Sequence, residues 1–104
     1  MPKRYLHHSD PDYGWLEVPG SDLQSLSVDE QISGFSYRDG DIAYLEDDQD
    51  AGTIRRQSRA AGWQIERKEH FVPGFSFVRN LSTFEPQGRV RALRILLGQS
   101  HGSQ

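Results

Sequence analysis

The stretch ISGFSYRDGDIAYL, residues 32–45, carries the clearest structural signal in this sequence. Two runs of β-branched and aromatic residues, 32–37 and 42–45, lie on either side of Asp39-Gly40. Asp-Gly is typical of a tight hairpin turn, because glycine tolerates the positive φ that such a turn requires. We therefore predict a β-hairpin that turns at these two residues.

Three further strands are predicted outside the hairpin. Residues 15–18 form an aromatic and aliphatic run that closes at Pro19-Gly20, and residues 63–67 alternate apolar with polar side chains. Residues 75–78 follow a Pro-Gly turn and are interpreted as a return strand. All three runs are short, as strands in small domains usually are.

Two helical segments are predicted between these strands. Ser21 is a suitable N-cap for a helical turn over residues 22–26. Asp50 is a suitable N-cap for a longer helix over residues 51–61, and Gly62 is well placed as the left-handed residue that ends it.

These elements predict an α+β fold, in which a small antiparallel sheet of about four strands carries one helix packed on a face. The length of 104 residues fits one domain with a single core. Near the C-terminus, an amphipathic segment carries a stripe of apolar side chains. We expect this stripe either to pack on the sheet or to mediate self-association. The predicted organisation is a flexible N-terminal arm at 1–12, the domain at 13–84, an amphipathic helical segment at 85–98 and a disordered tail at 99–104.

Composition excludes several classes of protein. The chain has no cysteine, which excludes a disulfide framework, a thiolate zinc site and a cysteine nucleophile. No run approaches the roughly 18 apolar residues of a membrane helix, and no apolar stretch follows the basic residues near the N-terminus. We therefore expect a soluble cytoplasmic protein that does not enter a membrane.

The net charge of −3 conceals a strong charge difference between the two halves of the chain. Residues 1–50 contain three basic and twelve acidic side chains, a net charge of −9. Residues 51–104 contain nine basic and three acidic side chains, a net charge of +6. This distribution predicts a dipolar surface, provided that the fold does not interleave the two halves.

Six carboxylates within twelve positions form the first candidate site, an acidic face that binds a protein partner. These carboxylates have two alternative roles: they stabilise the following helix through its dipole, or they form a metal site. A calcium loop counted from Glu46 would need glycine at Ala51 and glutamate at Gln57, so the metal reading fails and no metal or cofactor is predicted. The candidate residues are Asp39, Asp41, Glu46, Asp47, Asp48 and Asp50.

Basic side chains of the second half form the alternative candidate site, a nucleic-acid-binding face with Trp63, Phe75 or Phe77 as stacking partners. Two considerations oppose it. The pI near 5.7 is far below the value above about 9 that is typical of nucleic-acid-binding domains, and a solvated basic face can instead pair with the acidic half. The candidate residues are Arg55, Arg56, Arg59, Arg67 and Lys68.

No catalytic site is predicted. The run His7-His8-Ser9-Asp10 contains metal-ligand and triad residue types, but a triad is defined by spatial geometry, and we interpret the run as part of the flexible arm. His70 is interpreted as an ordinary surface histidine. The phosphate-binding loop, nucleophile elbow and zinc-helix motifs are all absent from the sequence, so we predict that the protein is not an enzyme.

Several pieces of the sequence resemble a family of small uncharacterised bacterial proteins with the motif order GWLEV…IS-YSY…G…YLEEDCD, whose members occur in bacterial, prophage and plasmid contexts. The resemblance covers about residues 13–84, and this chain has Gln49 where the family pattern has cysteine. It implies a shared fold and a mobile-element origin but no activity. The matching pieces are residues 14–19, 32–37, 40–50 and 60–62.

These observations lead us to expect a small non-enzymatic binding protein of the mobile-element type. Its acidic face would engage a protein partner, such as a nucleic-acid-handling enzyme, as an inhibitor or counter-defence protein of the anti-CRISPR or antirestriction kind does. The alternative is a nucleic-acid-associated accessory protein that uses the basic second half.

Overall fold

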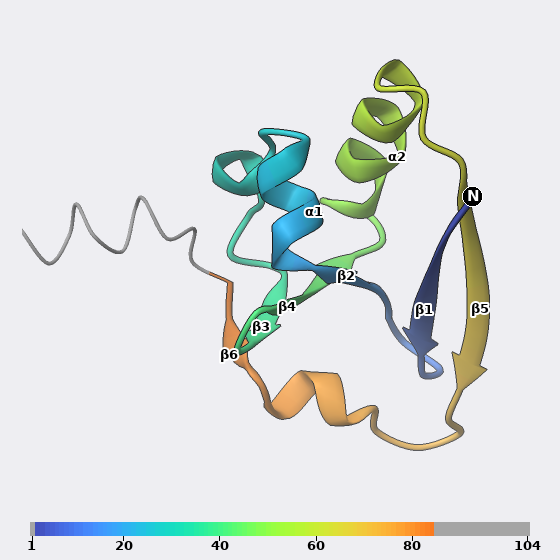
Figure 1. Cartoon of the computed structure of the whole chain (residues 1–104). Helices are drawn as coiled ribbons and strands as arrows, with labels where there is room; N and C mark the ends of the chain where they lie inside the picture. Colours follow the sequence, from blue (N-terminus) through green and yellow to red (C-terminus); the bar gives the residue numbers. More distant parts are fainter. Residues whose placement is uncertain (1, 85–104) are drawn as a thin grey trace, which may run out of the picture.

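The computed structural model describes residues 2–84 (Figure 1). These residues form one six-stranded sheet, two α-helices and two short 3-10 helices. The strands are β1 (Lys3–Ser9), β2 (Gly14–Pro19), β3 (Tyr37–Asp39), β4 (Ile42–Glu46), β5 (Ile65–Phe71) and β6 (Ser82–Thr83). The helices are α1 (Gly20–Ser25), η1 (Asp29–Gln31), α2 (Ala51–Ala60) and η2 (Phe77–Asn80).

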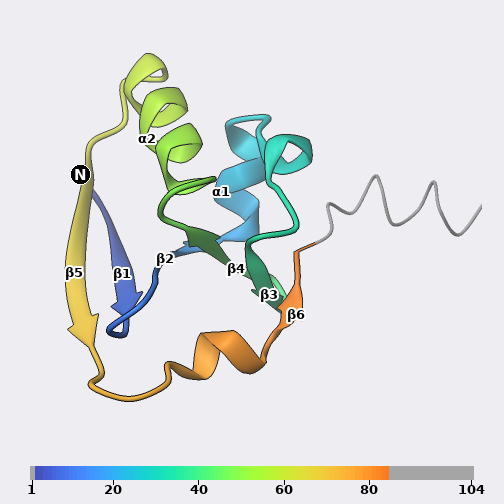
Figure 2. The ribbon, with the colours of Figure 1, turned by 180° about the vertical axis from the view of Figure 1, so that it is seen from behind.

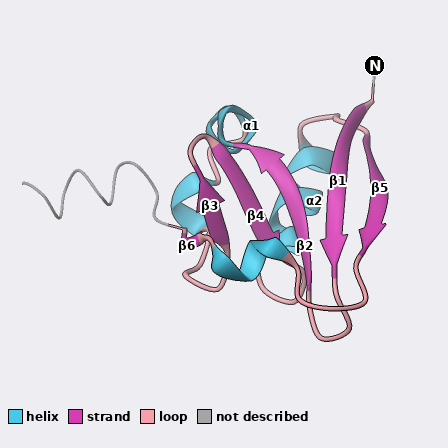
Figure 3. Ribbon diagram, turned by 90° about the horizontal axis from the view of Figure 1, so that it is seen from below, coloured by secondary structure: helices cyan, strands magenta, loops and turns pink. Residues whose placement is uncertain are grey.

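The sheet is mixed, with the strand order β5-β1-β2-β4-β3-β6 (Figure 3). β1 and β5 run parallel, whereas every other neighbouring pair runs antiparallel. The N-terminal strand β1 therefore lies inside the sheet, between β5 and β2.

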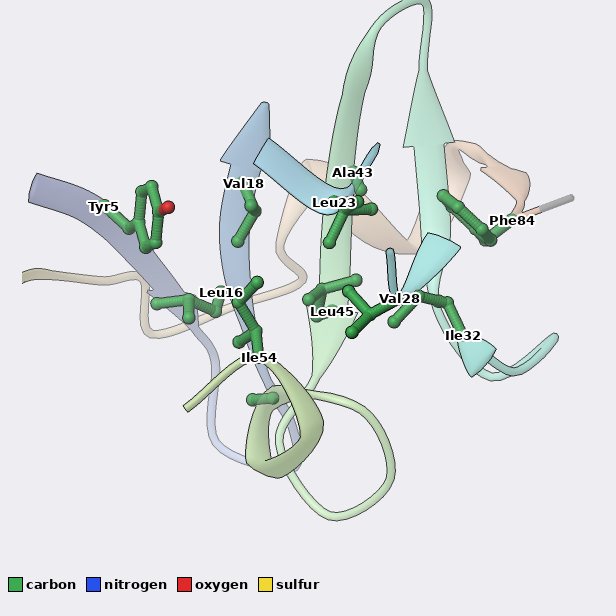
Figure 4. Packing of buried hydrophobic residues seen from close by; sticks show 11 residues of the cluster. Tyr5, Leu16, Val18, Leu23, Val28, Ile32, Ala43, Leu45, Ile54 and Phe84 are labelled. Atoms are coloured by element: carbon green, nitrogen blue, oxygen red, sulfur yellow. The ribbon is translucent and has the colours of Figure 1, made fainter. Parts of the chain in front are cut away.

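Helices α1 and α2 cover the same face of the sheet, which we call the helix face (Figures 1 and 2). Alternate residues of the central strands point to this face, and a buried side chain such as Leu45 stabilises the fold by about 1.5–3 kcal/mol. The main core lies here (Figure 4). Its buried members are Tyr5, Leu16, Val18, Leu23, Val28, Ile32, Ala43, Leu45, Ala51, Ile54 and Phe84.

The opposite face, which we call the open face, is partly covered by the connection from β5 to β6. These strands lie at opposite edges of the sheet, so residues 72–81 cross beneath it (Figure 1). Within this connection η2 buries Val78 against Trp15 and Tyr44, which together form a second, smaller core. The Phe77 ring also lies edge-on to Tyr44, with 5.7 Å between the ring centroids.

The predicted hairpin is confirmed. Asp39 pairs with Ile42, so Gly40 and Asp41 form a two-residue loop, and Gly40 has a φ of 59°. The first strand is shorter than predicted, since only β3 is extended and residues 32–36 form a loop.

The prediction of a flexible arm at residues 1–12 is wrong, because Lys3–Ser9 form β1. The arm was predicted from a polar sequence, yet three of its polar or amphipathic side chains are buried with acidic partners. The Tyr5 hydroxyl donates to Asp22 at 2.7 Å, and His8 Nε2 lies 2.8 Å from a Glu17 carboxylate oxygen. His7 is buried in the same way, so long-range polar contacts replace the apolar pattern that normally indicates a strand.

The predicted α+β class is confirmed, but the antiparallel sheet of about four strands is wrong. The sheet has six strands because β1 and β6 join the predicted ones. β1 also pairs in parallel with β5. The strand predicted at 63–67 begins at Ile65 and continues to Phe71. The return strand predicted at 75–78 is wrong, because this segment leads into η2.

The predicted long helix is confirmed as α2, and Gly62 beyond its end has a φ of 80°. Asp50 precedes the helix, but its side chain makes no capping hydrogen bond. The short helix begins earlier than predicted, so that Ser21 lies inside α1 and Pro19 occupies the N-cap position.

The C-terminal amphipathic segment predicted at 85–98 and the tail predicted at 99–104 lie outside the described residues. Among residues 2–84, no helix has the length and apolar character needed to span a membrane.

Candidate functional site

The structure divides the six acidic candidates into two groups. One group lies exposed at the hairpin tip, and the other lies at and beyond the far end of β4. A strand rises about 3.3 Å per residue, so the five residues of β4 hold the groups about 16 Å apart. The groups are Asp39 with Asp41, and Glu46 with Asp47, Asp48 and Asp50.

Asp50 serves the fold and is not accessible to a partner. Its side chain is buried and accepts hydrogen bonds from the Ser33 backbone N–H and hydroxyl, at 3.1 and 2.7 Å, and from the Ser36 hydroxyl. It therefore anchors the loop 32–36 that precedes β3, which explains why it does not cap α2.

Asp47 is half-buried against His7. One carboxylate oxygen of Asp47 lies 2.8 Å from His7 Nε2, and a Glu69 carboxylate oxygen lies 2.6 Å from His7 Nδ1. The His7 ring therefore lies between two carboxyl groups, with one on each ring nitrogen. A Cβ at Gly14 would overlap the Asp47 carboxylate, so glycine is needed for this close approach. The contact ties the turn after β4 to β5.

The other two acidic side chains of this group line a pocket on the open face, which we call the aromatic–acidic pocket. Its volume of about 530 Å³ lies within the range of roughly 300–1,000 Å³ for ligand sites. The lining residues are Tyr13, Trp15, Phe35, Tyr37, Glu46, Asp48, Gln49 and Arg79.

Aromatic rings from two parts of the chain, residues 13–15 and 35–37, form one wall of this pocket. The Trp15 ring packs edge-on against Tyr37 at 6.2 Å between centroids, and Tyr13 lies 6.1 Å from Trp15. Trp15 is only 2% exposed, whereas Phe35 is 66% exposed. The wall thus combines a fixed inner ring with outer rings that a ligand can reach.

Two carboxylates, those of Glu46 and Asp48, line the same pocket. Burial raises the pKa of Glu46, and the nearby charges of Asp48 and Asp47 raise it further, whereas backbone N–H groups that bond to its carboxylate oppose the rise. One of these bonds comes from the Asp48 N–H, at 3.0 Å from Glu46 Oε2. Asp48 itself is exposed.

Arg79 closes the pocket, and its charge is already neutralised. Its guanidinium makes two hydrogen bonds to the Asp10 carboxylate, at 2.8 and 2.7 Å, and a third to Asp12 at 3.3 Å. The bonded guanidinium holds the pKa of Asp10 well below its usual range, aided by backbone N–H bonds that include one from Ser76. The pocket as a whole therefore favours a positive ligand charge.

The basic candidates are also divided. Arg55, Arg59 and Arg67 line a second pocket, on the helix face. Lys68 points to the other face, because it alternates with Arg67 along β5. Arg56 does not line this pocket, and its guanidinium lies 3.4 Å from the Thr53 hydroxyl.

The predicted pairing of the basic side chains with the acidic half of the chain is found at Arg79, which pairs with Asp10 and Asp12, but not, among residues 2–84, at the arginines of α2. Arg67 pairs with Glu69, and no ion pair joins the described arginines of α2 to the six acidic candidates. The run 7–10 does not form a triad, since Asp10 binds Arg79. Within the described part of the chain, no group of three His, Asp or Glu side chains is arranged to hold a metal ion.

Sequence reasoning missed the pocket residues Tyr13 and Arg79, and Asp10, which binds Arg79. The ion pair between Asp10 and Arg79 spans 69 positions, so no local pattern indicates it. Phe35 and Tyr37 lie within one predicted strand, but in the structure Phe35 is in a loop and exposed, and Tyr37 is half-buried in β3.

Comparison with known proteins gives no independent indication of function. No protein-family model matches this chain, and searches of curated proteins and of solved structures gave no significant match. We therefore infer function from the two pockets.

Proposed function

We propose that this protein is a non-enzymatic binding protein that holds a basic side chain of a protein partner in the aromatic–acidic pocket. The observation that carries the proposal is that aromatic rings and the carboxylates of Glu46 and Asp48 line one pocket. A cation over an aromatic face gains about 0.5–2 kcal/mol, and more than one ring is available here.

The chemistry of Arg79 supports this choice of ligand. Its guanidinium carbon lies 4.8 Å from the centroid of Tyr13 and 4.4 Å from that of Phe75, while its nitrogens bond to Asp10. The protein thus already holds one arginine between rings and a carboxylate at the edge of the pocket. An arginine of a partner would meet the same combination in Phe35 and Asp48.

The Trp15 indole favours a peptide over a free amine. Its Nε1 is buried, and it has no hydrogen-bond partner among residues 2–84. An indole N–H can only donate, so it requires an acceptor. A backbone carbonyl beside the bound basic side chain supplies one.

The charge of the pocket also indicates the class of partner. Proteins that bind nucleic acids gather arginine and lysine in their phosphate-binding grooves. A protein that presents carboxylates and rings to such a groove blocks it, as expected for an inhibitor of a nucleic-acid-handling enzyme of the anti-CRISPR or antirestriction kind. This step is an analogy between charge patterns and rests on no matched relative.

The pocket can be tested before the partner is known. We would titrate isotope-labelled protein with acetyl-Gly-Arg-Gly-amide and with its citrulline counterpart, which has the same shape without the charge, and follow the Trp15 indole signal by NMR. We expect the arginine peptide to bind more tightly. Asp48→Asn and Phe35→Ala should each weaken binding about two- to fivefold, from the loss of an exposed ion pair or of one cation–π contact.

Asp39→Asn is the matched control, because it removes the same charge from another exposed aspartate that lies at the hairpin tip. This variant should bind the arginine peptide as the parent protein does. Equal binding of the arginine and citrulline peptides, or equal losses in Asp39→Asn and Asp48→Asn, would contradict the proposal. Replacing all six acidic residues together would be uninformative, since Asp50 and Asp47 hold the fold.

A further inference from the structure

The second pocket lies between α2 and β5 on the helix face, and we call it the arginine pocket. Arg55, Ser58 and Arg59 recur at helical spacing and face β5, where Ile65 and Arg67 alternate onto the same side. The result is a basic rim above an apolar floor. The lining residues are Leu16, Arg55, Ser58, Arg59, Trp63, Ile65 and Arg67.

The charges of the rim are poorly compensated within the described residues. Arg55 and Arg59 lie one helical turn apart, so they repel each other, and neither makes an ion pair with residues 2–84. Arg67 shares Glu69 with His7, and both the Arg67 and Glu69 side chains are about half exposed. An anion in the pocket would relieve this repulsion.

Ser58 adds a donor at the bottom of the pocket. The residue is 1% exposed, and its hydroxyl has no hydrogen-bond partner among the described residues. A buried hydroxyl without a partner is costly, which makes it a site for a ligand oxygen. Guanidinium groups and a hydroxyl together form a typical donor set for phosphate.

Trp63 separates the arginine pocket from a neighbouring hollow. That hollow has a volume of about 320 Å³ and is lined by Lys3, Gly62, Trp63 and Gln64. The Lys3 ammonium lies 4.6 Å from the centroid of the Trp63 ring and also pairs with Asp22 at 3.1 Å. A basic side chain and an aromatic ring therefore continue the surface beyond the arginine pocket.

We propose that this surface binds single-stranded nucleic acid, with backbone phosphates on Arg55, Arg59, Arg67 and Ser58 and an unpaired base stacked on Trp63. The arginine pocket measures about 210 Å³, below the roughly 300 Å³ at which small-ligand sites begin, so it does not enclose a free nucleotide. A strand that passes from one hollow to the next needs no enclosure. Base stacking on an aromatic ring beside basic side chains is the usual means of binding unpaired nucleic acid.

The test is fluorescence anisotropy of the full chain with labelled ten-nucleotide oligo-dT and oligo-U strands. With three arginines on phosphates, we expect log K to fall with log salt at a slope of about −2. Arg55→Gln combined with Arg59→Gln should weaken binding at least tenfold and bring the slope to about −0.7. Trp63→Leu should weaken binding and abolish quenching of the Trp63 fluorescence, and the oligo-dT and oligo-U arms distinguish DNA from RNA.

Arg56→Gln is the matched control, since it removes an arginine from the same helix outside the pocket. It should leave affinity within about twofold. Thermal melts and binding of the arginine peptide by the double variant check that the fold is intact. Absence of binding at 20 mM salt, or equal losses in Arg56→Gln and Arg59→Gln, would overturn the proposal. Equal binding of a duplex or of a ten-residue polyglutamate peptide would also overturn it, the latter indicating an acidic protein ligand.

Discussion

Trp15 and Leu16 are neighbours on β2, yet they line opposite pockets. Trp15 points to the open face and the aromatic–acidic pocket, whereas Leu16 points to the helix face and the arginine pocket. The charges of the two pockets are also held differently. Arg79 and Glu46 have hydrogen-bond partners within the protein, while Arg55 and Arg59 have no ion-pair partner among residues 2–84. In the first pocket the arginine is therefore paired within the protein and the carboxylates of Glu46 and Asp48 remain for a ligand, whereas the second pocket leaves its arginines for a ligand.

The largest expected effect is a loss of stability when the buried side chains at the base of the two pockets are truncated. Trp15→Ala should cost about 3–5 kcal/mol and Leu16→Ala about 2–5 kcal/mol, because each removes a side chain that is almost fully buried. Urea unfolding measures both. If Trp15→Ala cost less than about 1 kcal/mol, the open face would have a pocket but no second core, and the comparison of two packed faces would fail.

The second largest effect is expected at Asp10, whose carboxylate pairs with Arg79 on the open face. The pKa of Asp10 is lowered in the folded protein, so its stabilising contribution is present above the ordinary aspartate pKa near 4 and is lost as pH falls further. Asp10→Asn should lower the urea midpoint at pH 7, by less than Trp15→Ala does. It should also make stability less dependent on pH below about 4. Unchanged acid sensitivity in the variant would contradict this role.

The long-range origin of such contacts explains what sequence reasoning could and could not predict. The hairpin and α2 were predicted because local signals specify them, Gly40 in one case and helical spacing that ends at Gly62 in the other. Strand β1 was missed because Tyr5 and His7 are buried by partners far away in the sequence, Asp22 for the tyrosine and Asp47 for the histidine. The sequence of β1 does not show the alternation of apolar and polar residues that normally indicates a strand.

The candidate sites were only partly predictable for a related reason. Residue type and order placed six acids near one hairpin, but a strand of five residues separates them in space. The basic residues were predicted more closely, since Arg55 and Arg59 share one helix face by spacing alone. These arginines lie in one pocket with Arg67 because β5 pairs in parallel with β1. No local sequence pattern indicates that pairing.

A smaller effect is expected at the hairpin tip, which lines neither pocket. Gly40→Val should cost at least about 1 kcal/mol, because a β-branched residue resists the φ of 59° although no neighbouring atom obstructs its Cβ. Both ligands should bind the variant as they bind the parent protein. An unchanged melting midpoint would contradict the turn geometry, and a loss of binding would show that the hairpin tip is coupled to a pocket.

The smallest effect has the opposite sign and tests the uncompensated charge of the helix face. Arg55→Gln removes the repulsion between Arg55 and Arg59, and glutamine is about as good a helix former as arginine, so stability should rise by about 0.2–0.5 kcal/mol at low salt. The gain should shrink at 0.5 M salt, where screening weakens the repulsion. Arg4→Gln is the contrast, because Arg4 pairs with Glu66 at 3.1 Å and its loss should leave stability equal or lower. If Arg55→Gln destabilises the protein at low salt, Arg55 has a favourable partner in the native state and is paired as Arg79 is on the open face.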